Sequence, residues 1–330
     1  MKRQLKVMVG VLLGLAMLAL TACSSTVPGS PTAATGSPVA ARPAFGAYLD
    51  VSVKVPDLAT VAKQAGLKHV NLAFALALNG ACEPGWGGNQ PIDALKPQID
   101  AFKAAGGSVS AATGGAVGNY LENACATPGD LAGAYMKLLD TTGTNLLDVD
   151  IETGVDTAKV VEALRQVHAA RGTDITFTLP VDLGGIPAER LDLVQKAAAA
   201  NIPVTVNIMD MNFKTGGNWG QAMVDAAQAS LDQLRKVYPD ASEAAQNRSL
   251  AITVMIGRND VGVITQPEDA QKVIDFAKSR GVGRLGFWAL ARDNGGCAKK
   301  VKAQPNCSGI AQKDWQFTQQ FASYAGPTSA

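Results

Sequence analysis

Histidine and aromatic residues are scarce in this chain of 330 residues, which has two histidines and four tryptophans. His69 and His168 are accompanied by no Cys-x-x-Cys pair, which argues against a zinc site built from these residue types. No Gly-x-Gly-x-x-Gly follows the first expected strand, which argues against a dinucleotide-binding fold. We therefore expect neither a metal nor a cofactor. Because tryptophans are few, each one is considered as a candidate functional residue.

A basic cluster is also absent from the body of the chain. The 29 basic and 28 acidic residues give a formal charge of +1, and three of the basic residues lie at the extreme N-terminus. This balance argues against nucleic acid as a partner. Hydrophobic residues make up 47% of the chain, which is ample for a core.

The long apolar run of the chain, Val7 to Leu20, follows Lys2, Arg3 and Lys6 and is short for a membrane span. It ends in Leu20-Thr21-Ala22-Cys23, which resembles a bacterial lipoprotein signal cleaved before a lipid-modified Cys23. The alternative is an ordinary secretory peptide with an unmodified cysteine. We expect residues 1–22 to be the signal peptide. The protein would then lie in the cell envelope, anchored to a membrane by lipid or exported.

Residues 23–43 are rich in Ser, Thr, Pro, Gly and Ala and poor in large apolar side chains. Such a segment buries too little surface to offset the entropy of ordering, so we expect a flexible tether. The remaining residues, 44–326, have a length suited to one α/β barrel domain, which we expect to be monomeric.

Five cysteines are present, and lipidation of Cys23 would leave four. An exported chain meets an oxidising compartment, where pairing is expected. Of the three connectivities we favour Cys82–Cys125 and Cys297–Cys307. Both cysteines of the first pair lie in loops after expected strands, and the second pair closes a short loop. A metal site is the alternative, weakened by the shortage of histidine.

Apolar and polar patterning alternates between strand and helix throughout residues 44–326. The expected strands are Phe45–Val53, His69–Ala77, Ser108–Thr113, Asn145–Glu152, Asp174–Val181, Val204–Met211, Leu250–Ile256 and Arg284–Leu290. The expected helices are Asp57–Ala65, Ile92–Ala105, Gly129–Thr141, Thr157–Ala170, Ala188–Ala200, Gln221–Val237, Pro267–Ser279 and Asp314–Tyr324. Glycine C-caps are expected at Gly66, Gly106, Gly172 and Gly281.

Eight strand-then-helix units predict a closed parallel (β/α)8 TIM barrel of the α/β class. A doubly wound open sheet is the alternative, and the missing glycine fingerprint argues against it. In such a barrel the catalytic face lies at the carboxyl ends of the strands. Glu152 would lie at that end of the fourth strand.

The fourth expected strand carries three carboxylates on one face. Alternation places Asp148, Asp150 and Glu152 on this face and apolar side chains on the other. Buried carboxylates at this spacing raise one another's pKa, which is how a fold produces an acid that donates a proton near neutral pH. The alternative is an edge strand with a solvated acidic face.

These residues resemble the signature of glycoside hydrolase family 18, in which Asp-x-Asp-x-Glu ends the fourth strand. Ala112-Thr113-Gly114-Gly115 resembles its Ser-x-Gly-Gly, and Met209-Asp210-Met211-Asn212 resembles its Met-x-Tyr-Asp or Met-x-Met-Asp. Phe287-Trp288-Ala289-Leu290 resembles the motif of its last strand. The segments 82–88 and 288–294 look most like small secreted bacterial chitinases.

The resemblance implies roles for individual residues. Glu152 would protonate the glycosidic oxygen, and the substrate's own acetamido carbonyl would attack in place of a second protein carboxylate. Asp150 would hold the acetamido N–H, and Asp148 would share a proton with it. Trp288 would stack on the sugar. The remaining substrate contacts would be Tyr48, Trp86, Met209, Met211 and Asn212.

Several positions depart from the family pattern. Asn145 and Leu146 replace the first Asp and Gly of the signature, at the start of the strand, where we expect structural effects. Met211 stands where most members have Tyr, Phe213 also replaces a Tyr, and Asn212 stands where they have Asp. The amide keeps the shape and removes one negative charge.

The sequence therefore predicts a hydrolase acting on β-1,4-linked N-acetylglucosamine polymers, either chitin or a peptidoglycan-like glycan. A second hypothesis is a glycan-binding protein that keeps the groove with weak or no turnover. The intact acidic residues favour the enzyme. A third is an envelope scaffold that uses the barrel without binding sugar.

Overall fold

The computed structural model describes residues 43–54 and 56–324 of the chain. The expected signal peptide, the lipidation site Cys23, and the tether up to residue 42 lie outside the described residues. Within the described ranges, no helix is long and apolar enough to cross a membrane.

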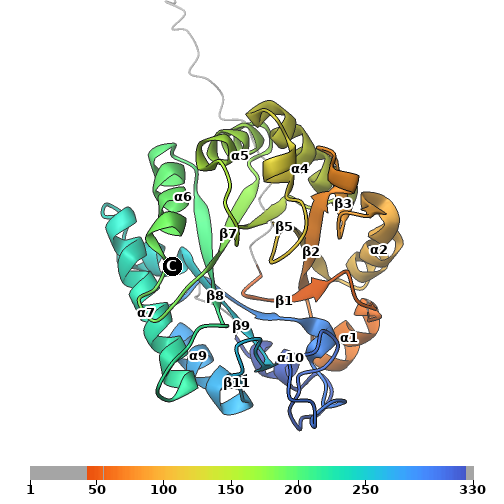
Figure 1. The fold of residues 1–330 in the computed structure, drawn as a ribbon, viewed down its shortest axis with the longest axis vertical. Coiled ribbons are helices and arrows are strands. Elements are labelled where there is room, and N and C mark those ends of the chain that lie inside the picture. The colour runs from red at the N-terminus through yellow and green to blue at the C-terminus, as the bar shows by residue number, and fades with distance from the viewer. Residues whose placement is uncertain (1–42, 55, 325–330) are drawn as a thin grey trace, which may run out of the picture. The chain divides into compact units, whose positions relative to one another are not determined.

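Parallel strands form a closed ring at the centre of the described domain (Figure 1). The ring strands are β1 (Phe45–Asp50), β2 (His69–Ala77), β5 (Ser108–Gly114), β6 (Leu146–Asp150), β7 (Asp174–Pro180), β8 (Val204–Asp210), β9 (Leu250–Met255) and β12 (Arg284–Trp288). Strand β1 pairs in parallel with both β12 and β2, and these two pairings close the ring. The predicted TIM barrel is confirmed, and the open doubly wound sheet is excluded.

Helices surround the ring on the outside (Figure 1). They are α1 (Leu58–Ala65), α2 (Lys96–Ala104), α4 (Pro128–Thr142), α5 (Thr157–Arg171), α6 (Ala188–Ala199), α7 (Trp219–Val237), α9 (Pro267–Arg280) and α10 (Gln316–Phe321). The expected helix at 92–105 is divided into a 3₁₀ turn, η2 (Ile92–Leu95), and α2. The last helix is shorter than predicted at both ends.

Helix termini follow the capping residues in the sequence. Asp57 precedes α1 and accepts a hydrogen bond from the Ala59 backbone N–H at 3.1 Å, which satisfies a donor left free at a helix start. Gly66 ends the same helix with φ of +73°, in the left-handed region that glycine adopts without strain. Gly172 and Gly281 end α5 and α9 in the same way. Gly106 ends α2 one residue beyond Ala105: it has φ of +87°, and the Gly107 N–H donates to the Phe102 carbonyl at 2.9 Å, so the predicted glycine stop is confirmed.

The barrel also has shorter helices and strands that the sequence did not predict. They are η1 (Leu78–Gly80), β3 (Pro84–Trp86), β4 (Gln90–Pro91), α3 (Leu121–Ala124), α8 (Glu243–Arg248), β10 (Gly257–Arg258), β11 (Ile264–Thr265) and η3 (Leu290–Arg292). Strands β10 and β11 pair antiparallel and form a hairpin beyond the end of β9.

Strand β6 has two different faces. Leu147 and Val149 are buried in the large apolar cluster that joins the strands to the helices. Alternation then directs Asp148 and Asp150, which are 1% and 3% exposed, towards the barrel interior. The edge-strand alternative for this segment is wrong, because β6 pairs with β5 on one side and β7 on the other.

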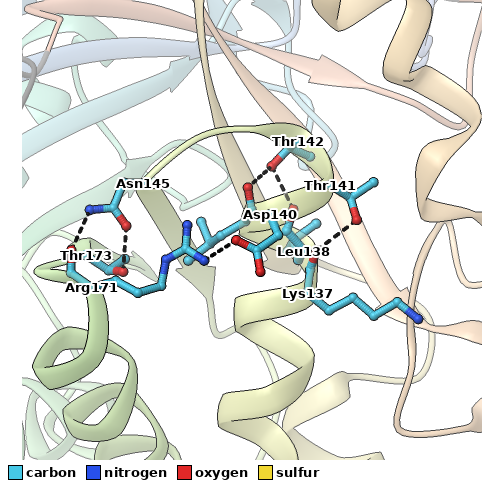
Figure 2. Close-up of polar contacts among 9 residues, drawn as sticks. Lys137, Leu138, Asp140, Thr141, Thr142, Asn145, Arg171 and Thr173 are labelled. Atoms are coloured by element: carbon cyan, nitrogen blue, oxygen red, sulfur yellow. Dashed lines mark hydrogen bonds and ion pairs between the residues drawn. The ribbon is translucent and has the colours of Figure 1, made fainter.

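The start of β6 is fixed by a polar cluster (Figure 2). The Asn145 amide nitrogen donates to the Arg171 carbonyl at 3.1 Å, and the Thr173 hydroxyl donates to the Asn145 amide oxygen at 2.8 Å. Arg171 also forms an ion pair with Asp140 of α4. The contacts of Asn145 therefore tie β6 to the connection between α5 and β7, as expected for a structural position.

Both predicted disulfides are present. Cys82, in the loop after η1, bonds Cys125, which follows α3, across 43 residues of chain. Cys297 bonds Cys307 across 10 residues. The first bridge links the loop before β3 to the end of α3, and the second closes a short loop after η3.

Candidate active site

A cavity of about 250 Å³ opens at the carboxyl ends of the barrel strands. Its wall contains most of the residues that the sequence predicted. They are Tyr48, Asp150, Glu152, Met209, Met211, Asn212 and Trp288. Asp148 precedes Asp150 on the same face of β6 and lies deeper, with 1% of its surface exposed.

Asp148 accepts hydrogen bonds from two neighbouring strands. The Tyr48 hydroxyl of β1 donates to Asp148 Oδ2 at 2.5 Å, and the Thr178 hydroxyl of β7 donates to Oδ1 at 2.6 Å. Hydrogen bonds to the charged form of a carboxyl group stabilise that form. The two hydroxyls therefore favour an ionised Asp148.

A buried asparagine fixes the direction of these two hydrogen bonds. Asn207 of β8 donates from Nδ2 to the Tyr48 and Thr178 hydroxyl oxygens, each at 3.0 Å. Its amide oxygen accepts from the Thr253 hydroxyl of β9 at 2.9 Å. Because both hydroxyls already accept from Asn207, their own protons point to Asp148. Five barrel strands thus contribute to one network beneath the cavity.

Asp150 has a different environment from Asp148. Its Oδ1 atom is buried and has no hydrogen-bond partner within the described residues. Burial, followed by the neighbouring charges of Glu152 and Asp148, raises the pKa of Asp150 well above its usual value. These effects disfavour the charged form of Asp150, and its Oδ1 remains an oxygen that can accept a hydrogen bond from a substrate.

A further carboxyl, Glu122, is fully buried behind β5 and also raises the pKa of Asp150. Its Oε1 accepts from the Thr113 hydroxyl at 2.6 Å and from the Tyr135 hydroxyl at 2.7 Å. Burial raises the pKa of Glu122 itself, which favours its neutral form. Its hydrogen bonds join β5, which pairs with the acidic strand β6, to α4.

Glu152 lies two residues after the end of β6, and hydrogen bonds to its backbone N–H and carbonyl fix its position. Its N–H donates to the Tyr120 hydroxyl oxygen at 3.1 Å, and its carbonyl accepts from the Arg190 guanidinium at 2.8 Å. Burial raises the pKa of Glu152 to about 7, the Arg190 charge opposes the shift, and the Asp260 charge adds to it. Near neutral pH the side chain therefore exists in both protonation states, as a general acid requires.

An aromatic surface faces the carboxyl groups. Trp288 ends β12, is partly exposed and stacks on Phe74 of β2, with ring centroids 5.7 Å apart and planes inclined by 13°. The Tyr48 ring lies 6.1 Å from Trp288. A flat apolar surface of this kind beside polar groups suits the face of a sugar ring.

Met209, Met211 and Asn212 form the wall at the end of β8. Asn212 has φ of +59°, a left-handed conformation that asparagine tolerates better than most side chains. Its side chain contacts Asp260, in the turn of the β10–β11 hairpin. The residue that replaces the family's acid therefore contacts another acid.

The structure does not place Trp86 at the cavity, and its predicted sugar contact is wrong. Trp86 is fully buried in the apolar core, and its indole N–H donates to the Ile92 carbonyl at 2.8 Å. Its position in the β3–β4 hairpin next to the Cys82–Cys125 bridge gives it a packing role.

The cavity wall also includes residues that the sequence reading missed. They are Phe74, Ala116, Thr178, Thr253, Met255 and Asp260. Phe74, Thr178, Thr253 and Met255 lie towards the ends of predicted strands, so counting alternate positions in each strand could have found several of them. Asp260 lies in a hairpin for which the sequence offered no strand signal. Within the described part of the chain, no three His, Cys, Asp or Glu side chains form a metal-binding group.

The fold and this site define a (β/α)8 barrel with a protonatable carboxyl group at the end of its fourth strand. Comparison with models of known protein families gives no match. The chain is 31% identical over 286 residues to a probable bifunctional chitinase/lysozyme of Escherichia coli, and 29% identical over 283 residues to endochitinase 11 of Metarhizium anisopliae. Each alignment covers 78% of this chain, but only 32% and 54% of these two longer relatives.

A solved structure matches along its whole length. The catalytic domain of a hyperthermophilic chitinase from Pyrococcus furiosus superposes with a TM-score of 0.81 at 32% identity, covering 88% of this chain and 98% of that domain. The chain therefore belongs to the chitinase family.

Proposed function

We propose that this protein is a chitinase-like glycoside hydrolase that cleaves β-1,4-linked N-acetylglucosamine polymers. One observation carries the proposal: a buried acid with a pKa of about 7, Glu152, shares a cavity with the unpartnered Oδ1 of Asp150. The relatives, which are named as chitinases of a bacterium, a fungus and an archaeon, support the substrate class.

We propose the following sequence of roles. The sugar to be cleaved stacks on Trp288, and Glu152 donates its proton to the glycosidic oxygen as that bond breaks. The acetamido carbonyl of the same sugar attacks the anomeric carbon, so this reaction departs from the usual scheme with two catalytic carboxylates. Asp150 Oδ1 accepts the acetamido N–H and orients the group. Water then opens the cyclic intermediate, with Glu152 acting as base, and the anomeric configuration is retained.

Hydrolysis of soluble N-acetylglucosamine oligomers by the wild-type protein and by Glu152→Gln tests the proposal. The amide is nearly isosteric and holds no transferable proton, so we expect the rate to fall by about a hundred-fold or more. Glu268→Gln, a change at an exposed glutamate of α9, is the matched control and should leave the rate unchanged. Tight oligomer binding without hydrolysis by the wild-type protein would favour the binding-protein hypothesis instead.

The anomeric form of the first product separates the mechanisms. NMR should show the β-anomer released from a β-linked oligomer before mutarotation. Initial release of the α-anomer would mean inversion, and substrate-assisted attack would have to be abandoned.

We further propose that the mature protein is a monomeric, lipid-anchored envelope protein with a tether between Cys23 and the barrel. The Leu20-to-Cys23 junction after an apolar leader supports this, and two disulfides accord with an oxidising compartment. The precursor should partition with membranes and be released by detergent. Cys23→Ala should remain unprocessed or become soluble, and an unchanged membrane fraction for this variant would contradict the proposal.

A further inference from the structure

The β10–β11 hairpin brings a carboxylate to the cavity that the family resemblance does not assign. Asp260 lies between the two short strands of the hairpin and lines the same cavity as Glu152 and Asp150. Its side chain is exposed to solvent. A carboxylate in this place adds negative charge to the cavity from a loop that is distant in sequence from β6.

Asn212 holds Asp260 through a pair of reciprocal hydrogen bonds. The Asn212 amide nitrogen donates to Asp260 Oδ2 at 2.9 Å, and the Asp260 backbone N–H donates to the Asn212 amide oxygen at 2.8 Å. One side chain must therefore donate and accept at the same time. An amide does both, whereas a carboxylate at position 212 has no proton to donate and would repel Asp260.

The rest of the hairpin is anchored to buried groups. Asn259, which is 1% exposed, accepts from the Asn212 backbone N–H at 3.1 Å and donates to the Met255 carbonyl at 3.0 Å. Arg292, also 1% exposed, donates to the carbonyls of Ile256 at 2.9 Å and Arg258 at 2.6 Å. The chain before Asp260 is therefore fixed by buried groups, and the chain after it is held by the pairing of β10 with β11, so the carboxylate occupies a defined position in the cavity wall.

Several charged or titratable groups face Glu152. Arg190, which binds its carbonyl, lowers the pKa of Glu152, while the negative charge of Asp260 raises it. Asp150 and Tyr120 are the remaining neighbours, and the Glu152 charge raises the pKa of both. On the other side of Asp260, the buried guanidinium of Arg292 is the facing positive charge.

We propose that Asp260, held by Asn212, is a positioning residue that keeps Glu152 in its proton-donating form, and that the carboxylate lost at position 212 is supplied from the hairpin. Asp260 acts through its charge and does not transfer a proton itself. This inference rests on the proposed hydrolase function, since it concerns the same acid. The inference also explains the amide at position 212: Asn212 holds Asp260, and Asp260 supplies the negative charge that an aspartate at position 212 would have carried.

The first test is a titration of the Glu152 carboxyl group by ¹³C NMR without substrate, in the wild-type protein and in Asp260→Asn. Loss of the facing charge should lower the Glu152 pKa by about half a unit to one unit, with a smaller difference at high salt. Val261→Ala, at the exposed neighbouring residue, should leave the titration unchanged. An identical Glu152 pKa in the wild-type protein and Asp260→Asn would overturn the inference.

The pH–rate profile on soluble oligomers is the second readout. Because Glu152 is active when protonated, Asp260→Asn should move the alkaline limb of the profile to lower pH by the same amount. The rate at acidic pH should stay within about threefold of wild type, since the acid itself remains. A loss of a hundred-fold or more at every pH would instead give Asp260 a direct part in the chemistry and contradict the positioning role.

An exchange of the two side chains is the sharpest test. Asn212→Asp alone places two carboxylates at hydrogen-bonding distance. The pair of hydrogen bonds between residues 212 and 260, which we call the clamp, should then break, and the pH–rate profile should change. The double variant Asn212→Asp/Asp260→Asn restores one donor and one acceptor and keeps one negative charge in the cavity. Its profile should return towards that of the wild-type protein.

A single Asn212→Asp variant that behaves like the wild-type protein, or a double variant no better than the single one, would refute the clamp. The titration needs no turnover. A wild-type protein without hydrolysis would therefore refute the proposed function while the Glu152 measurement still tests the role of Asp260.

Discussion

The two ends of strand β6 use polar side chains in opposite ways. At its start, Asn145 donates to Arg171 and accepts from Thr173, so its amide is satisfied on both sides (Figure 2). At its carboxyl end, Asp150 is buried with an unpartnered oxygen, and the pKa of Glu152 is raised to about 7. Polar groups at the start of the strand are therefore paired and stabilise the fold, whereas those at its carboxyl end are left available for proton transfer and substrate binding. This division matches the stability and catalytic faces of a (β/α)8 barrel.

Among substitutions at the two ends of β6, the replacement of Asp150 should have the largest effect on activity. Asp150→Asn removes the carboxyl group whose Oδ1 accepts the acetamido N–H and which can ionise next to the developing positive intermediate, so we expect the hydrolysis rate to fall by about a hundred-fold or more. The protein should lose no stability, because the change also removes a buried carboxyl with a raised pKa. Rate measurements and thermal unfolding on one preparation check both statements. A clear fall in melting temperature would contradict the view that this end of β6 is not built for stability.

Thr178→Val should have the next largest effect, because it removes a donor to Asp148 with little change of shape. A hydrogen bond to a charged group contributes about 1.5–3 kcal/mol. We therefore expect a rate loss of about tenfold or more, with Asp148 becoming easier to protonate. Thr178→Ser keeps the hydroxyl and is the matched control. Equal rates for the two variants would show that the network beneath the cavity does not set the state of Asp148.

The sequence was sufficient to predict the barrel and the acidic strand, because both depend on local patterns. Alternation predicted the inward direction of Asp148 and Asp150, and Gly66 predicted the end of α1. The strand predicted to reach Glu152 ends its ladder at Asp150, since side-chain patterning does not reveal where backbone pairing stops.

The remaining features depend on contacts between distant segments. Trp86 was predicted to be a sugar contact, but its exposure depends on packing in the β3–β4 hairpin, which no local pattern encodes. The network that runs from Thr253 through Asn207 and the Tyr48 hydroxyl to Asp148 joins residues on four strands that are far apart in sequence. Asp260 was missed for the same reason, because its importance arises only from its contact with Asn212.

Asp210, the last residue of β8, is another buried carboxyl, but it lies outside the active site. Its neighbours in sequence, Met209 and Met211, line the cavity, whereas Asp210 does not. Both of its oxygens are buried without a hydrogen-bond partner in the described structure, and burial raises its pKa well above the usual value. A carboxyl whose pKa is raised by folding stabilises the fold at low pH, and this contribution is lost as pH rises through the folded-state pKa.

Asp210→Asn should therefore increase the free energy of unfolding at neutral pH. The gain should approach about 1.4 kcal/mol for each unit that the pKa is raised by folding, and it should vanish near pH 4. Urea unfolding at several pH values measures this difference. A gain that does not depend on pH would mean that Asp210 does not titrate as its burial implies.

Asn145→Ala should have the smallest effect, and that effect should be on stability alone. The change removes hydrogen bonds from a half-buried amide, and each such bond contributes about 1 kcal/mol, so we expect a loss of about 1–2 kcal/mol. The rate should be unchanged, because Asn145 precedes the carboxyl groups at the far end of the strand. Asp140→Asn is the matched control nearby: its ion pair with Arg171 is solvent-exposed, and such pairs contribute about 0–1 kcal/mol. A slower reaction in Asn145→Ala at full stability would show that the two ends of β6 are coupled, and the division of labour along this strand would be wrong.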